Sequence, residues 1–168
     1  MTAAERQAML TAEDDVLLRD CDLIMQKGMG NGGQKINKTS SSVHLRHRPT
    51  GIAVSANEER SQFRNRHIAL RKLRYEIALH VRADDFSLSG GTFACLPAPS
   101  PANHDRLIPW TAALFDRLAA SDFELAKTAA LCGVSASQLE HVLRKYPQLW
   151  RTFSEARNRI KQNGGIPE

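Results

Sequence analysis

The chain has 168 residues, of which 42% are hydrophobic and 24% charged, and its formal net charge is +5. This composition is typical of a globular protein and excludes a disordered or fibrous chain. The longest apolar runs span only a few residues, whereas a membrane-spanning helix needs about 20 apolar residues, so a membrane protein is excluded as well.

The N-terminal segment is acidic and unlike a signal or transit peptide, so we expect a cytoplasmic protein. Thr11 followed by Asp14 resembles a capping box and predicts a short helix that ends near Leu18. Residues 22–26 are expected to form the first strand.

A β-hairpin is predicted after a glycine-rich stretch. Apolar and polar residues alternate over 43–47, residues 49–51 read Pro-Thr-Gly, and residues 52–54 continue as a second strand. Alternation on both sides of a turn is typical of two antiparallel strands.

A long helix is predicted from Arg60 to Arg82, because apolar residues recur there at helical spacing with basic residues between them. The apolar stripe consists of Phe63, Ile68, Leu70, Leu73, Ile77 and Val81. For Phe63, Leu70, Leu73 and Ile77 a place in the core is favoured over a base-stacking surface. Residues 1–82 are therefore predicted to form an α+β domain with a small sheet packed on a long helix.

Residues 83–105 contain a Gly pair and three of the seven prolines, which predicts a linker. Residues 106–168 are then predicted to form an all-helical module. Its first helix runs from about residue 107 to 120.

Two further capping boxes are expected in this module, Ser121 with Glu124 and Ser135 with Gln138. Pro147 suits the first turn of a last helix running to residues 164–165. The pair of helices joined at 132–135 has the form of a helix-turn-helix, which is a weak indication of DNA binding because many bundles use the same turn.

Cysteine usage points to reduced structural thiols. Cys21, Cys95 and Cys132 are few, odd in number and far apart in the sequence. They form no Cys-x-x-Cys pair that would indicate zinc or a redox centre. We expect no metal and no organic cofactor.

The charge is unevenly distributed along the chain. Residues 1–25 carry a net charge of −4, residues 26–82 carry +9, and residues 83–168 carry none. A basic block of this size favours a polyanionic partner such as nucleic acid, with a solvated basic surface as the alternative.

Four of the ten glycines lie within residues 28–33. Glycine is needed where φ is positive or where backbone approaches a ligand closely, so this loop is expected to present backbone N–H groups. The loop does not match the Walker A pattern, and its Rossmann-like spacing lacks a βαβ context. A nucleotide cofactor is therefore not expected.

Four motifs follow one another within the basic block. They are Gly30-Asn31-Gly32-Gly33-Gln34, Asn37-Lys38-Thr39, His47-Arg48-Pro49-Thr50-Gly51-Ile52, and Arg60-Ser61-Gln62-x-x-Asn65-Arg66 with Ala69-Leu70. In this order and spacing they resemble the catalytic domain of class I peptide chain release factors and of their small ribosome-rescue relatives. The resemblance covers about residues 21–82.

The resemblance implies hydrolysis of the ester that joins a nascent peptide to P-site tRNA in the ribosomal peptidyl transferase centre. The implied catalytic residues are Gly32, Gly33 and Gln34. A fixed backbone N–H, here that of Gln34, can contribute about 3 kcal/mol by stabilising developing negative charge. The two glycines aim this amide, while the Gln34 side chain helps admit water. No protein general base is needed, because ribosomal RNA and the tRNA hydroxyl serve instead, and the histidines are given no catalytic role.

The implied partners are large-subunit ribosomal RNA and the P-site peptidyl-tRNA. The motif glutamine is often methylated in this superfamily, which would add a glutamine methyltransferase acting on Gln34. Candidate RNA-binding residues are Lys27, Lys35, Asn37, Lys38, Arg46, Arg60, Gln62, Arg64, Asn65 and Arg66. Asn37 and Asn65 could instead hold the loop by hydrogen bonds, and Arg71, Lys72 and Arg74 fit either RNA contact or a solvated face.

The chain departs from the family pattern in several ways. Asn31 stands where Pro or Ala is usual, and Met29 where a small polar residue is common. The first predicted strand begins near residue 22, which leaves no room before it for codon-reading domains. The basic C-terminal tail of the rescue hydrolases is missing, and its nearest equivalent, residues 144–161, carries six basic residues and one acidic residue but has the pattern of a folded helix.

These features favour a codon-independent hydrolase that rescues stalled ribosomes, with the helical module as its targeting device. The alternative is a non-catalytic ribosome- or RNA-binding regulatory protein on the same scaffold. It is motivated by Asn31, by the missing tail and by the polar residues of the third module helix, which are Gln138, His141, Arg144 and Lys145. Sequence-specific DNA binding is disfavoured, because the C-terminal half has no net charge.

Overall fold

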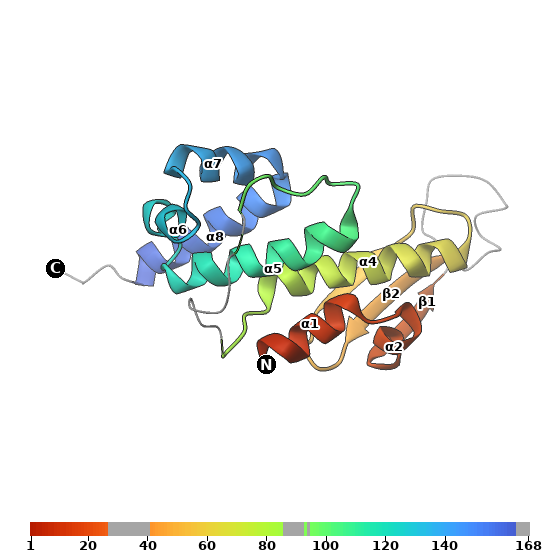
Figure 1. The fold of residues 1–168 in the computed structure, drawn as a ribbon. Coiled ribbons are helices and arrows are strands. Elements are labelled where there is room, and N and C mark those ends of the chain that lie inside the picture. Colours follow the sequence, from red (N-terminus) through yellow and green to blue (C-terminus); the bar gives the residue numbers. More distant parts are fainter. Residues whose placement is uncertain (27–40, 86–92, 94, 164–168) are drawn as a thin grey trace. The chain divides into compact units, whose positions relative to one another are not determined.

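A computed structural model describes residues 1–26, 41–85, 93 and 95–163 (Figure 1). This part of the chain is α+β, as predicted. Its elements are α1 (Ala3–Thr11), α2 (Asp14–Arg19), β1 (Cys21–Gln26), β2 (Ser42–His47), β3 (Ala53–Ala56), α4 (Gln62–His80), α5 (His104–Ala120), α6 (Leu125–Leu131), α7 (Ala136–Lys145) and α8 (Pro147–Asn163). None of these helices is long and apolar enough to cross a bilayer.

The chain forms two compact units. One comprises Gln7–Ile77, and the other comprises Met1–Arg6 together with Ala78–Glu168. The prediction of a domain over 1–82, a linker over 83–105 and a module over 106–168 stays a prediction. Residues 86–92 and 94 of the predicted linker lie outside the described residues.

The first unit contains an antiparallel sheet with the strand order β1-β2-β3. Leu45 in the central strand lies opposite Leu23 on one side and Val54 on the other. Gly51 has a φ of +71°, and its N–H donates to the His47 carbonyl at 2.8 Å, which closes the turn between β2 and β3. The predicted hairpin is confirmed.

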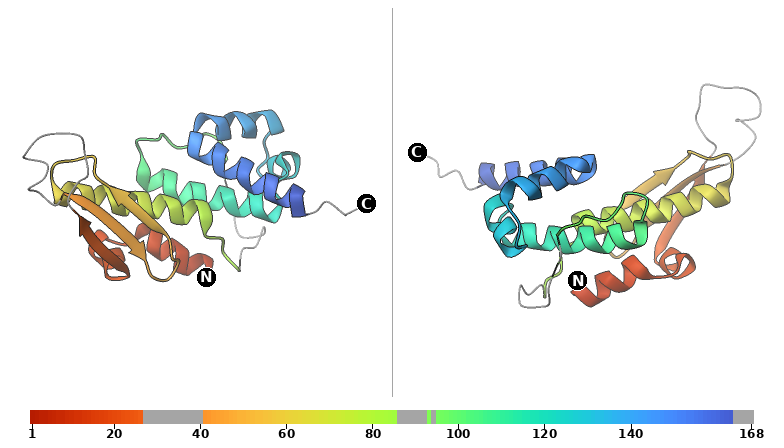
Figure 2. Two further views of the ribbon diagram at one scale, coloured as in Figure 1. Left: turned by 180° about the vertical axis from the view of Figure 1, so that it is seen from behind. Right: turned by 45° about the horizontal axis from the view of Figure 1, so that its top comes forward.

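Helix α4 runs beside the strands in both views of Figure 2 and supplies most of the core on its side of the sheet. Leu70, Leu73 and Ile77 are at most 1% exposed, as expected for the apolar stripe. The expectation that Phe63 belongs to the core is wrong, because its side chain is 60% exposed. The reason is that an open pocket of about 90 Å³ remains between the first turn of α4 and the sheet.

The N-terminal capping box is also wrong. The Thr11 hydroxyl donates to the carbonyl of Gln7 at 2.9 Å at the end of α1, a helix that was not predicted. Helix α2 begins after Glu13, which makes no side-chain capping bond. The end of α2 at Arg19 agrees with the expectation within one residue.

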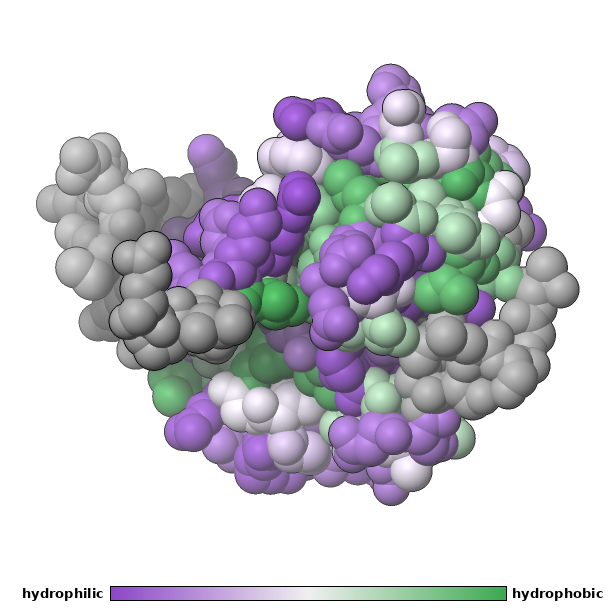
Figure 3. All heavy atoms as spheres, turned by 90° about the vertical axis from the view of Figure 1, so that its left-hand side faces the viewer, coloured by the Kyte–Doolittle hydropathy of each residue, from purple (hydrophilic) through white to green (hydrophobic). Residues whose placement is uncertain are grey.

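The second unit is helical and has its own core. Its fully buried large side chains are Leu114, Phe115, Leu118, Leu139, Leu143, Leu149 and Phe153. An ion pair is buried with them: Arg6 Nη1 and Nη2 donate to the two carboxylate oxygens of Asp116 at 2.7 and 2.5 Å. On the molecular face drawn in Figure 3, hydrophobic residues are interspersed with hydrophilic ones.

Of the two capping boxes and the helix-starting proline predicted in the helical module, one capping box and the proline are confirmed. Ser135 and Gln138 form a reciprocal capping box with distances of 2.9 and 3.2 Å, and Pro147 is the first residue of α8. The capping box at Ser121 is wrong, because its hydroxyl donates to the Arg117 carbonyl and α6 begins only at Leu125. The predicted end of α8 at 164–165 lies outside the described residues.

Segments far apart in the sequence meet in this unit. The Tyr146 hydroxyl donates to the Pro99 carbonyl. The thiols of Cys95 and Cys132 form a hydrogen bond with each other, although both cysteines are unoxidised. This bond lowers the pKa of Cys132 to about 7 and raises the pKa of Cys95.

Candidate functional site

The predicted catalytic residues Gly32, Gly33 and Gln34 lie outside the described residues, as do Lys27, Lys35, Asn37 and Lys38. The structure does describe the two strands that flank them. Gln26 at the end of β1 pairs with Ser42 at the start of β2. The segment that carries the glycine motif therefore leaves and re-enters the sheet at paired positions.

Asn65 holds the chain at the start of β2. Its Oδ1 accepts from the Glu59 backbone N–H at 2.8 Å, and its Nδ2 donates to the carbonyls of Ser41 and Glu59 at 2.7 Å each. The residue is 0% exposed. With its polar atoms engaged by backbone and buried, Asn65 fits the loop-holding alternative better than direct RNA contact.

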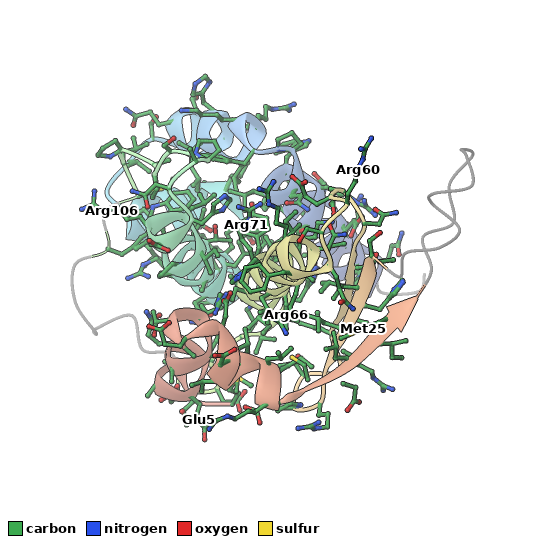
Figure 4. The ribbon with its side chains drawn as sticks, turned by 90° about the vertical axis from the view of Figure 1, so that its right-hand side faces the viewer. Glu5, Met25, Arg60, Arg66, Arg71 and Arg106 are labelled. Carbon is green, nitrogen blue, oxygen red and sulfur yellow. The ribbon has the colours of Figure 1, made fainter. Side chains whose placement is uncertain are left out.

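The basic candidates of the last motif gather at the start of α4. Arg60 and Arg64 are exposed, while Arg66 is half-buried (Figure 4). Arg64 lies 3.7 Å from Glu59 in a surface ion pair, which contributes little stability. Arg46 is exposed but lies on β2 four residues beyond Ser42, or about 13 Å along the strand. Figure 4 shows Arg60 and Arg66 on different sides of α4, so the structure places these arginines near the start of the helix without forming one cluster, and Arg46 lies farther along β2.

Other basic residues of α4 are engaged within the domain. Lys72 donates to the carboxylate of Glu58. Arg74 lies 2.7 Å from the carboxylate of Asp14, which His67 also contacts at 2.5 Å. Partial burial alone would raise the pKa of Asp14, but the hydrogen bonds from Arg74 and His67 outweigh it and lower that pKa. This part of the basic face stabilises the fold.

His47 also has a structural place. It is 0% exposed, and its Nδ1 lies 2.9 Å from the Thr50 hydroxyl within the hairpin turn. Burial lowers the pKa of His47 below its ordinary value. His47 therefore helps to close the hairpin turn.

The sequence interpretation missed an aromatic surface next to the flanking strands. The exposed ring of Phe63 lines the pocket of about 90 Å³ together with Met25, Arg66, Gln62, Leu23 and Val43. The helical period placed Phe63 on the correct face of α4 but could not show where the covering sheet ends. No signal in the sequence distinguished Phe63 from Leu70.

A small antiparallel sheet and a long basic helix agree with the α+β domain that the release-factor resemblance implies. Residues 13–86 match the RF-1 domain family. The chain is 46% identical over 77 residues to peptide chain release factor 1 of Anaeromyxobacter sp. (strain Fw109-5), covering 42% of the chain and 21% of the relative. It is 48% identical over 64 residues to peptide chain release factor 1 of Thermotoga maritima, covering 37% and 19%.

Residues 13–86 thus match the catalytic domain superfamily of class I peptide chain release factors. The match includes Gly32, Gly33, Gln34 and Asn65. The chain spans about a fifth of the length of the curated relatives it matches.

Proposed function

We propose that this protein hydrolyses the ester of peptidyl-tRNA in the ribosomal peptidyl transferase centre and so releases the nascent peptide. The observation that carries this proposal is the RF-1 domain match over residues 13–86, which includes the Gly-Gly-Gln motif at 32–34. The similar proteins are peptide chain release factors. In this proposal the protein acts in translation termination, in the cytoplasm.

In this proposal the chain contributes a backbone donor. The Gln34 N–H stabilises negative charge that develops on the reacting ester, a contribution of about 3 kcal/mol or roughly a hundredfold in rate. Gly32 and Gly33 allow the backbone to aim this amide, and the Gln34 side chain admits water. Large-subunit ribosomal RNA and the P-site tRNA complete the site, and a glutamine methyltransferase acting on Gln34 is a further partner in this proposal.

The finer proposal is codon-independent rescue of stalled ribosomes. Residues 87–168 lie outside the RF-1 match, and their described part is helical. Helices α7 and α8 carry exposed arginines, among them Arg144, whose guanidinium lies 4.0 Å from the centre of the Trp150 ring. Arg144 is paired with Glu140 at 2.8 Å and Arg151 with Glu155 at 2.9 Å. Residues 144–161 still carry six basic residues and one acidic residue, which suits RNA, so the helical unit is proposed to direct the catalytic domain to its ribosome.

The test is release of labelled formyl-methionine from ribosomes that hold initiator tRNA in the P site. Three complexes are compared, with no message beyond the P site, with a sense codon in the A site, and with a stop codon there. We expect release from the truncated message, and its loss in Gln34→Ala, Gly32→Ala and Gly33→Ala.

Normal release by all three variants would refute the mechanism. Release only at stop codons would refute codon independence. Ribosome binding without release in any complex would favour the non-catalytic RNA-binding alternative.

A further inference from the structure

The exposed ring of Phe63 is the starting point for a site outside the glycine loop. Its side chain is 60% exposed, in the first turn of α4, and Met25 beside it on β1 is 47% exposed. Leu23 and Val43 complete the apolar lining of the pocket, which measures about 90 Å³. A volume this small does not enclose a ligand, but it leaves a flat aromatic face open to a planar group.

Two neighbours fix the orientation of this ring. The Arg66 guanidinium carbon lies 5.4 Å from the ring centre, in a cation–π contact. The His67 ring meets the Phe63 ring edge-on, with centres 4.5 Å apart and planes at 78°. An aromatic ring held from two directions loses little entropy when a second ring stacks on it.

The cation that contacts the ring is Arg66. Arg60 and Arg64 are exposed near the start of α4, and the nearby carboxylates are paired, Glu59 with Arg64 at 3.7 Å and Asp14 with Arg74 at 2.7 Å and with His67. The Arg66 guanidinium offers a planar fork of donors that suits a phosphate. A cation against an exposed aromatic ring is typical of single-stranded nucleic-acid sites.

We propose that Phe63, Arg66 and Met25 bind one unpaired base of ribosomal RNA, with the base stacked on Phe63 and its phosphate on Arg66. The proposal rests on the proposed function for the choice of ribosomal RNA. In the proposed function the end of the tRNA is bound near Gln34, which is eight residues from both Gln26 and Ser42. We therefore assign the pocket beside Phe63 to the ribosomal RNA that lines the peptidyl transferase centre.

The test uses the full chain and a fluorescently labelled single-stranded decaadenylate. We compare wild type with Phe63→Ala, Phe63→Trp, Arg66→Gln and the matched control Ile24→Ala. Ile24 is similarly exposed, at 55%, but points to the opposite face of the sheet from Leu23 and Met25. Thermal melts show that each variant is folded, which is expected for Phe63→Ala because its ring is mostly exposed.

Phe63→Ala is expected to weaken binding roughly tenfold, the size of losing one base stacked on an aromatic ring. Phe63→Trp and Ile24→Ala are expected to keep wild-type affinity. The slope of log Kd against log salt should stay the same in Phe63→Ala and fall by about 0.7 in Arg66→Gln, because Arg66 contacts a phosphate in this proposal and Phe63 does not. Equal affinity of Phe63→Ala and Ile24→Ala would overturn the proposal.

A release assay separates this proposal from the proposed function. If wild type releases peptide, Phe63→Ala should raise the protein concentration needed for half-maximal release, with less effect on the maximal rate. Release by wild type that does not depend on Phe63 at any concentration would overturn the site and leave the function intact. Absence of release by wild type would refute the function, while the oligonucleotide titration would still decide the site.

Discussion

Replacing Asn65 with alanine tests whether this side chain holds the sheet to the start of α4. The substitution removes three partly buried hydrogen bonds, one accepted from the Glu59 N–H and two donated to the carbonyls of Ser41 and Glu59. Each such bond contributes about 1 kcal/mol net. The expected loss in free energy of unfolding is about 3 kcal/mol, a large part of the 5–15 kcal/mol that is typical of a domain.

Urea unfolding followed by circular dichroism measures this loss. Asn65→Asp is the matched variant, because it keeps the oxygen that accepts from Glu59 but replaces the donor that serves the two carbonyls. A carboxylate facing two carbonyls has a raised pKa in the folded state, so Asn65→Asp should regain stability as the pH falls through that raised pKa, and the gain should be complete below the unfolded pKa of about 4. A loss below about 1 kcal/mol in Asn65→Ala would refute the reasoning, since one bond alone accounts for that much.

Two further predictions concern buried charge. Burial lowers the pKa of His47 below its ordinary value of 6.5. The unfolded chain therefore binds one more proton than the folded chain at acidic pH, and the free energy of unfolding falls as the pH drops below about 6.5. His47→Gln should flatten this pH dependence in urea midpoints measured between pH 7 and 5, and equal slopes in wild type and variant would contradict the argument. Arg6→Met leaves the Asp116 carboxylate, in a residue only 4% exposed, without its bidentate partner but with Arg82 still 3.6 Å away, and should cost about 3 kcal/mol of unfolding free energy, the lower end for a broken buried pair. The double variant with Asp116→Leu should lose less than the two single losses added together, and simple additivity would show that the pair is not coupled.

The sequence predicted elements well where local signals and tertiary packing agree. The turn at Gly51 has a glycine at the positive φ that the hairpin needs, and the strands on both sides alternate as a half-buried sheet requires. The stripe of Leu70, Leu73 and Ile77 faces a core as its period indicates. At these positions the residue type that suits the backbone also suits the environment.

The two wrong capping boxes share a physical cause. Thr11 and Ser121 both donate their hydroxyls to a carbonyl four residues earlier, at the end of the preceding helix. Ser135 caps the helix ahead of it, because Gly133, at a φ of +65°, has already ended the preceding helix. The pattern of a hydroxyl followed by a polar residue does not tell which of the two helices the hydroxyl serves.

The site could be predicted only in part. Helical periodicity shows which face of the helix carries a side chain, but it does not show how far the sheet that covers this face extends. Phe63 and Leu70 lie two helical turns apart on one stripe, yet one is 60% exposed and the other 1%. The same limit applies to Asn65, whose contact with Ser41 joins residues that are distant in the sequence. Both alternatives for Asn65 were compatible with the sequence, and the structure shows its side chain bonded to the backbone of Glu59 and Ser41.

The number of basic residues in residues 26–82 is larger than the number of cations that this domain can offer to RNA phosphates. Residues 26–82 carry a net charge of +9, but Lys72 and Arg74 are engaged by the carboxylates of Glu58 and Asp14. Cations held in this way release few counterions when RNA binds, because their charge is already compensated. The salt dependence of RNA binding should therefore report fewer phosphate contacts than the block has basic residues, with Arg60 and Arg66 among those that count.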